Sequence, residues 1–164
     1  SAYFPNWQVV THVPRTQVFP AGATITVEHS YVPDTGGSVG GTLYPAVRQE
    51  FPESLAQYKA VYCIDDQFLA GFDKRVMAAS EEERWGFSET WIGYVLKSGA
   101  NWSGPIADFR LVVDKGQPGN LVSFCMDGEV TKISPTQFEV RRTNFEPTRD
   151  LDILILNTAP YKGE

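Results

Sequence analysis

The sequence has few of the residues that usually carry catalysis or bind metals. Its 164 residues include two histidines, His12 and His29, and two cysteines, Cys63 and Cys125. Gly36-Gly37-Ser38-Val39-Gly40 matches the letters of the Gly-x-Ser-x-Gly motif, but it lies in a glycine-rich loop that no helix clearly follows, so we expect no nucleophile elbow there. The cysteines form no Cys-x-x-Cys pair, which excludes the common redox and zinc motifs. We therefore expect no catalytic residue set, no metal site and no cofactor.

Long apolar runs and basic runs are also missing. The most apolar segment covers only residues 151–156 and contains Asp152, whereas a membrane-spanning helix needs roughly 20 apolar residues. The formal net charge is −6, so phosphate backbones repel the chain. We expect neither membrane insertion nor nucleic-acid binding.

The residues that are present indicate one packed core. Hydrophobic residues make up 42% of the chain and aromatic residues 13%, and 14 Gly and 11 Pro are spread between short segments. No repeat or linker divides the sequence, so we expect a single β-rich domain over residues 1–164. The chain begins at Ser1 without an initiator Met, and we expect a processed or trimmed form.

Several segments have the pattern of β-strands. Residues 24–31 alternate cleanly and place His29 and Tyr31 on the same face as Ile25 and Val27, which predicts a strand with a half-buried histidine. Turn residues separate five later candidates, and residues 33–42 form a glycine-rich surface loop. The later strands are expected at 91–96, 109–114, 121–125, 138–142 and 151–156.

A helical insertion is expected around residues 52–84. Ile64, Phe68, Phe72 and Val76 recur every four residues and predict a main helix over 66–79, with Leu69 and Met77 alongside. Asp65 is a candidate N-cap. Pro52 favours a short helix after it, and Ser80 to Glu83 has the spacing of a capping box. The fold class predicted is mainly β, an antiparallel β-sandwich with an α-helical insertion.

Cys63 and Cys125 allow two interpretations. They form a disulfide if the domain is exported, or they remain two buried free thiols if it is cytosolic.

Much of the chain resembles a known family. The matching stretches are residues 91–106, 108–116, 121–125 and 132–140, together with Phe19-Pro20-Ala21-Gly22, residues 27–31, Gly36-Gly37-Ser38 and Tyr62-Cys63-Ile64-Asp65. These look like the bacterial domain-of-unknown-function family 4424.

The resemblance implies an exported protein, periplasmic or secreted, of which this chain is the C-terminal part. An oxidising location favours the disulfide Cys63–Cys125. The family has no established catalytic residues, so the resemblance assigns none here.

Four residues are candidates for ligand binding. Trp102 follows Asn101 in a turn where an indole can stack on a sugar ring or anchor a partner, although it can equally fold back onto the core. His29 and Tyr31 are the other two.

The leading hypothesis is a non-catalytic binding or structural module of the cell envelope, with another envelope protein or a glycan as its partner. The alternative is a carboxylate-dependent hydrolase whose site is completed by a missing N-terminal region. A converging carboxylate pair in a cleft, one with a raised pKa, would favour the enzyme. A flat face with clustered aromatic residues would favour binding.

Overall fold

A computed structural model of the chain describes residues 14, 16–39, 41–84 and 87–158. It divides into two units, residues 1–32 and 33–164, which are described separately.

The described part of the first unit, residues 14 and 16–32, contains no helix and no strand. A turn lies at Ala21-Gly22: the Ala23 amide donates to the Pro20 carbonyl, and Gly22 has a left-handed φ of 73°. The strand predicted over 24–31 is wrong, because no ladder of the structure includes these residues. Alternation of polar and apolar residues gives a segment two different faces, but a strand also needs backbone hydrogen-bond partners. His29 and Tyr31, which were expected on the face shared with Ile25 and Val27, are exposed.

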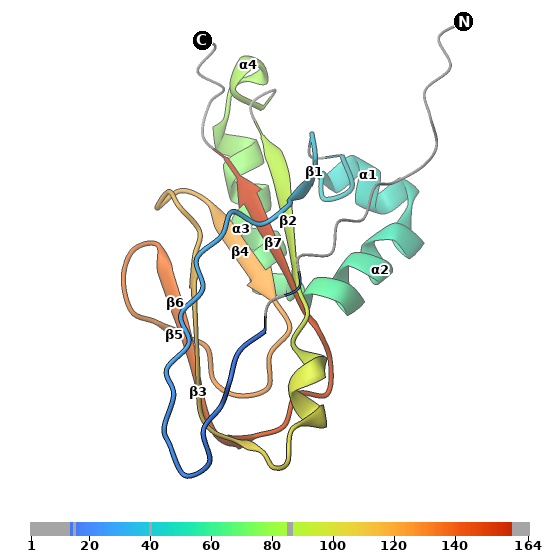
Figure 1. Cartoon of the computed structure of the whole chain (residues 1–164). Helices are drawn as coiled ribbons and strands as arrows, with labels where there is room; N and C mark the ends of the chain where they lie inside the picture. The colour runs from blue at the N-terminus through green and yellow to red at the C-terminus, as the bar shows by residue number, and fades with distance from the viewer. Residues whose placement is uncertain (1–13, 15, 40, 85–86, 159–164) are drawn as a thin grey trace, which may run out of the picture. The chain divides into compact units, whose positions relative to one another are not determined.

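The second unit is built on two antiparallel sheets (Figure 1). The four-stranded sheet has the order β1(Gly36–Ser38), β2(Ser88–Tyr94), β7(Leu151–Asn157), β4(Leu121–Phe124). The three-stranded sheet has the order β3(Ile106–Asp114), β6(Gln137–Phe145), β5(Thr131–Lys132). The predicted sandwich-like, mainly β fold is thus confirmed. All five later strands were predicted within a few residues of their bounds, whereas β1 and β5 were not.

Strand β7 explains why the chain needs a third layer. Side chains alternate across a strand, so Ile153 and Ile155 face one way and Leu154 and Leu156 the other. The first pair joins a buried cluster with Val113 and Val140 of the three-stranded sheet, while the second pair joins a cluster formed with the helices. The four-stranded sheet is therefore covered on both faces, and its central strand reads as an almost continuous apolar run.

The helices form the third layer and follow the sequence signals closely. They are α1(Pro45–Glu50), α2(Pro52–Tyr62), α3(Asp66–Ala78) and α4(Glu81–Arg84). Asp65 caps α3 as expected: its Oδ1 accepts the Phe68 amide proton at 2.6 Å. Ser80 and Glu83 form the expected capping box, with bonds of 2.7 and 3.2 Å.

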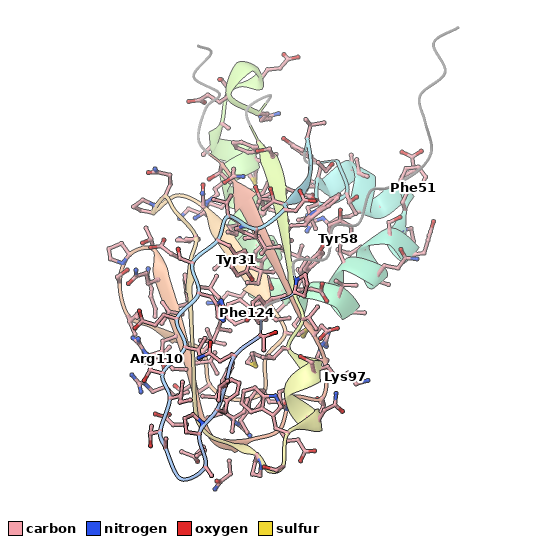
Figure 2. All side chains as sticks on the ribbon, viewed as in Figure 1. Tyr31, Phe51, Tyr58, Lys97, Arg110 and Phe124 are labelled. Carbon is pink, nitrogen blue, oxygen red and sulfur yellow. A yellow bond between two sulfur atoms is a disulfide. The ribbon has the colours of Figure 1, made fainter. Side chains whose placement is uncertain are left out.

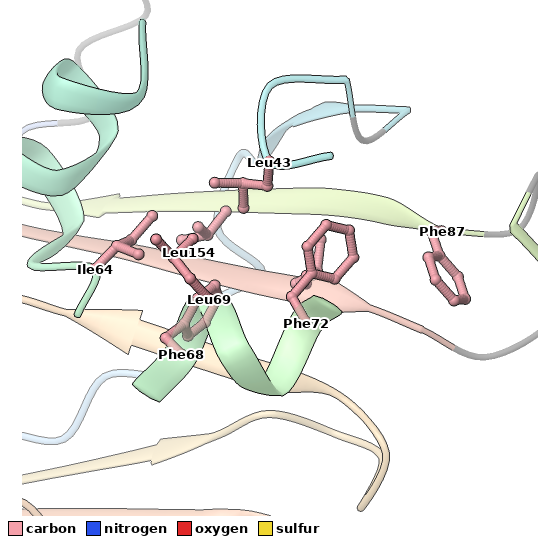
Figure 3. Close-up of a cluster of buried hydrophobic side chains, with 8 residues drawn as sticks. Leu43, Ile64, Phe68, Leu69, Phe72, Phe87 and Leu154 are labelled. Atoms are coloured by element: carbon pink, nitrogen blue, oxygen red, sulfur yellow. The ribbon is translucent and has the colours of Figure 1, made fainter. Parts of the chain in front are cut away.

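Helix α3 packs the predicted stripe on the sheet. Phe68, Leu69 and Phe72 are buried against Leu154 (Figure 3). Met77 was expected alongside this stripe but is 83% exposed, because it lies near the helix end on the solvent side. The buried stripe fixes the helical layer on one face of the four-stranded sheet.

The two cysteines form the disulfide Cys63–Cys125, with 62 residues of sequence separation. Cys63 ends α2 in the left-handed conformation, at φ 53°, and Cys125 follows β4. The bond therefore joins the helical layer to the edge strand of the four-stranded sheet.

Candidate functional site

The sequence-predicted binding residues belong to two different units of the chain. Asn101 and Trp102 lie side by side at the end of the 3-10 helix η1(Lys97–Asn101), and Trp102 is 66% exposed rather than folded onto the core. His29 and Tyr31 belong to the other unit, where Tyr31 is 64% exposed. Each pair remains a prediction on its own.

Sequence reasoning missed a buried carboxylate, Glu89 of β2. Glu89 is only 3% exposed. Its Oε2 accepts hydrogen bonds from the Tyr58 hydroxyl and the Trp91 indole nitrogen, both at 3.0 Å. Its Oε1 is buried and has no hydrogen-bond partner among the described residues. A buried polar atom left unpaired is expensive, which makes this carboxylate a candidate functional group.

Strand register places Glu89 and Trp91 on the helical face. Glu89 pairs with Leu156 and Trp91 with Leu154, the two β7 residues that face the helices. The predicted strand began at Trp91, three residues after the observed start at Ser88, so it left Glu89 outside. Glu89, Trp91 and Gly93 share one face of the strand, but no apolar alternation marks that face as buried.

The glycine-rich segment holds the Trp91 ring. Gly36 pairs with Trp91, and a Cβ on Gly36 would lie 2.9 Å from the ring carbon Cε3. A Cβ on Gly37 would lie 2.7 Å from the Glu89 carbonyl oxygen. The segment expected to be only a surface loop therefore forms β1, and its lack of side chains lets the indole lie against the backbone.

A pocket opens in front of this carboxylate. It has a volume of about 210 Å³ and is lined by Gln57, Tyr58, Val61, Tyr62 and Trp91. We call it the aromatic pocket. The rings of Tyr58 and Tyr62, one helical turn apart on α2, lie 5.6 Å apart at an angle of 63° and form a corner. Figure 2 shows Tyr58 on the side of α2 nearest β2.

The pocket has a negative electrostatic environment. Burial raises the pKa of the Glu89 carboxyl, and its bonds from Tyr58 and Trp91 only partly oppose this rise. Burial and then the charge of Glu89 raise the pKa of Tyr58 to about 12. Burial, followed by the charges of Asp152 and Glu89, raises the pKa of Tyr62. Two carboxylates therefore act on the phenols that line the pocket.

Another buried charge, Lys115, serves the fold. Its Nζ donates to the carbonyls of Pro118 and Asn120 at 2.8 and 2.6 Å, holding the loop before β4. Lys115 also lines a groove of about 470 Å³ along the edge strand β4. Its ammonium group already donates to two backbone carbonyls, so we assign it to the fold and not to a ligand in that groove. In the described part of the chain, no group of three His, Cys, Asp or Glu side chains is placed to hold a metal ion.

Comparison with protein families gives one match. The family described as a domain of unknown function (DUF4424) matches residues 1–154. The chain belongs to the DUF4424 family. Searches of curated proteins and of solved structures found no significant match. The family confirms the resemblance seen in the sequence and assigns no activity, so the function of this DUF4424 chain has to be argued from its own residues.

Proposed function

We propose that this DUF4424 chain is a non-catalytic binding module of the cell envelope, periplasmic or secreted, which takes a small ligand or the end group of a larger one in the aromatic pocket. The observation that carries the proposal is the half-bonded carboxylate of Glu89 behind two of the side chains that line the pocket. A fold that only needed stability would gain by replacing such a group with an apolar one.

The disulfide supports the proposed location. Disulfides persist in oxidising compartments and are rare in the reducing cytosol. Among the described residues, no helix combines the length and apolar character needed to cross a bilayer. A ligand met outside the cytosol, carried by an envelope protein or by a glycan, fits this location.

The pocket favours binding over hydrolysis. A carboxylate-dependent hydrolase needs two carboxyl groups on either side of the bond that breaks. No carboxylate is among the described residues that line the aromatic pocket, and Glu89 reaches it only through Tyr58 and Trp91. Clustered aromatic side chains without such a pair are the pattern expected of a binding site.

A ligand screen by NMR on the isotope-labelled chain tests this function. The panel contains organic ammonium compounds, neutral sugars and neutral alcohols. We expect at least one class to shift the signals of Tyr58, Tyr62 and the Trp91 indole together. Shifts confined to another surface, or no shift with any class, would overturn the proposal.

Tyr62→Leu and Tyr94→Leu give a matched pair of variants for the same screen. Tyr62 lines the pocket, whereas Tyr94 is an exposed tyrosine on β2 outside it. Binding should fall with the first variant and stay unchanged with the second.

A further inference from the structure

The shape of the aromatic pocket suits a cation. Three of its lining side chains, Tyr58, Tyr62 and Trp91, are aromatic, and two of these rings meet at a steep angle. The face of an aromatic ring carries partial negative charge and attracts a cation within about 6 Å of its centre. A group that touches several rings at once receives this attraction from each of them.

The charges around the pocket have the same sign. Glu89 lies behind Tyr58 and Trp91, and the charges of both Glu89 and Asp152 act on Tyr62. Val61 and Tyr62 are also the last residues of α2, where the helix dipole is negative. Carboxylates and helix terminus together favour a positively charged occupant.

Neighbouring cations already have partners outside the pocket. The Lys59 Nζ lies 2.9 Å from Asp66 Oδ1, and Arg149 donates to the carbonyls of Ala60 and Val61 at 3.5 and 3.3 Å. Neither side chain lines the pocket among the described residues. These bonds weaken the dipole of α2, and no cation of the described residues is paired with the Glu89 carboxylate.

The polar inventory argues against a bare metal ion and against a sugar. Hard metal ions need several oxygen ligands, and a sugar needs a hydrogen-bond partner for most of its hydroxyl groups. Of the described lining residues, Gln57 offers an amide and Tyr62 a hydroxyl, while the Tyr58 hydroxyl and the Trp91 indole N–H are already bonded to Glu89. A cation whose surface is methyl groups needs no such partners, and it is easier to desolvate than a compact ammonium or metal ion because its charge is spread over a larger surface.

We propose that the aromatic pocket binds the quaternary or methylated ammonium group of a small organic cation, with Tyr58, Tyr62 and Trp91 around the charge and Glu89 behind them. This assignment rests on the proposed function and narrows its ligand to one chemical class. Glu89 acts as a positioning residue, because it holds Tyr58 and Trp91 by hydrogen bonds and adds negative charge without touching the ligand.

Choline and 3,3-dimethylbutan-1-ol provide the direct test, because they have nearly the same shape and differ in charge. Both are titrated into the full chain by NMR and calorimetry. We expect choline to shift the Trp91 indole and Tyr62 signals and to bind roughly tenfold more tightly than the alcohol, the size of a desolvated cation–π interaction.

Three outcomes overturn the assignment and separate it from the proposed function. If the two ligands bind equally in the pocket, the site is apolar rather than cation-selective, and the proposed function stands. If neither binds but a sugar of the screening panel does, the ligand class is wrong and the function again stands. If no compound of any class binds the pocket, both proposals fail.

Variants separate the role of charge from that of structure. Glu89→Gln keeps the shape of the side chain and should weaken choline binding several-fold while leaving the alcohol unchanged, a difference that a purely structural role would not produce. Tyr62→Phe keeps the ring and should retain most of the affinity, whereas Tyr62→Leu should lose most of it. Melting curves first establish that the three variants fold. If they then bound choline with equal affinity, the assignment would be overturned.

Discussion

Glu89 and Lys115 are both buried and both charged, but they differ in how fully their polar atoms are hydrogen-bonded. Lys115 lies at the edge of the inter-sheet region, where its Nζ donates to two carbonyls and sits 5.8 Å from the centre of the Phe138 ring. Glu89 lies under the helical layer and keeps one oxygen without a partner. The Lys115 ammonium group is bonded to the backbone of the fold. The Glu89 carboxylate, in contrast, keeps an oxygen that can still accept a hydrogen bond and a charge that can act on nearby groups.

The contrast supports the proposed location of the binding site. A buried charge with all its partners specifies structure, as Lys115 does for the loop before β4. A buried charge with spare bonding capacity costs stability, which is why we propose a binding role for Glu89 and a structural role for Lys115.

Of the changes that test this contrast, breaking the disulfide should cause the largest loss of stability. Cys63 and Cys125 join the helical layer to β4, and closing a loop of this length stabilises by about 4 kcal/mol in the chain-entropy treatment. Reduction, or Cys63→Ser with Cys125→Ser, should lower the unfolding free energy by that order. Hydrogen exchange should then rise more in α2 and α3 than in β3 and β6. Equal melting curves with and without reductant would contradict the assigned role of the bond.

Lys115→Met should cause the second largest loss of stability. The variant keeps the apolar stem but leaves the Pro118 and Asn120 carbonyls without their charged donor, which costs about 1.5–3 kcal/mol. Chemical denaturation measures the loss. Ligand binding in the aromatic pocket should be unchanged, because Lys115 has no place in it. A stability within error of wild type would show that Lys115 is not the structural charge that the contrast requires.

Gly37→Ala should disturb the aromatic pocket through strand β1, which lies against Glu89 and Trp91. The added Cβ meets the Glu89 carbonyl oxygen at 2.7 Å, a contact that needs a backbone shift and costs about 1–3 kcal/mol. Gly41→Ala is the control, since a Cβ there meets nothing within 4 Å. The two variants are compared by thermal unfolding and by Trp fluorescence. Equal melting temperatures would mean that β1 tolerates side chains and does not hold the site.

Several parts of this structure were predictable because their signals are local. The five later strands and α3 follow from side-chain periodicity, and Asp65 and Ser80 follow from capping chemistry, in which a side chain bonds its own helix end. The outer strand β1 was not predictable, since Gly36 and Gly37 have low strand propensity and pair only because β2 supplies the partner.

The candidate site was less predictable than the fold. Glu89 reads as an ordinary polar residue at a strand end, and its burial depends on α2 arriving over β2 from a distant part of the sequence. Conversely, residues 24–31 alternate well but belong to no ladder. Periodicity identifies faces, whereas only tertiary contacts decide which faces are covered.

Glu89→Gln should have the smallest effect on stability and the most informative pH dependence. The pKa of Glu89 is raised above its usual 4.5, so the folded state holds this proton more tightly than the unfolded chain. Wild type should therefore lose stability as pH rises above about 4.5 and the carboxyl ionises, and the variant should lack this loss. Near pH 4 the two proteins should differ by less than about 1 kcal/mol. A stability difference that stays constant from pH 4 to 8 would contradict the raised pKa.

The central claim is that a half-bonded carboxylate lies directly behind the aromatic pocket, and the Trp91 indole N–H that bonds to it reports this most directly. Its NMR signal, assigned with Trp91→Phe, can be followed from pH 3 to 8. The account predicts a single titration of this signal with a midpoint above 4.5, absent in Glu89→Gln. A signal that does not titrate, or that titrates at or below 4.5, would contradict it.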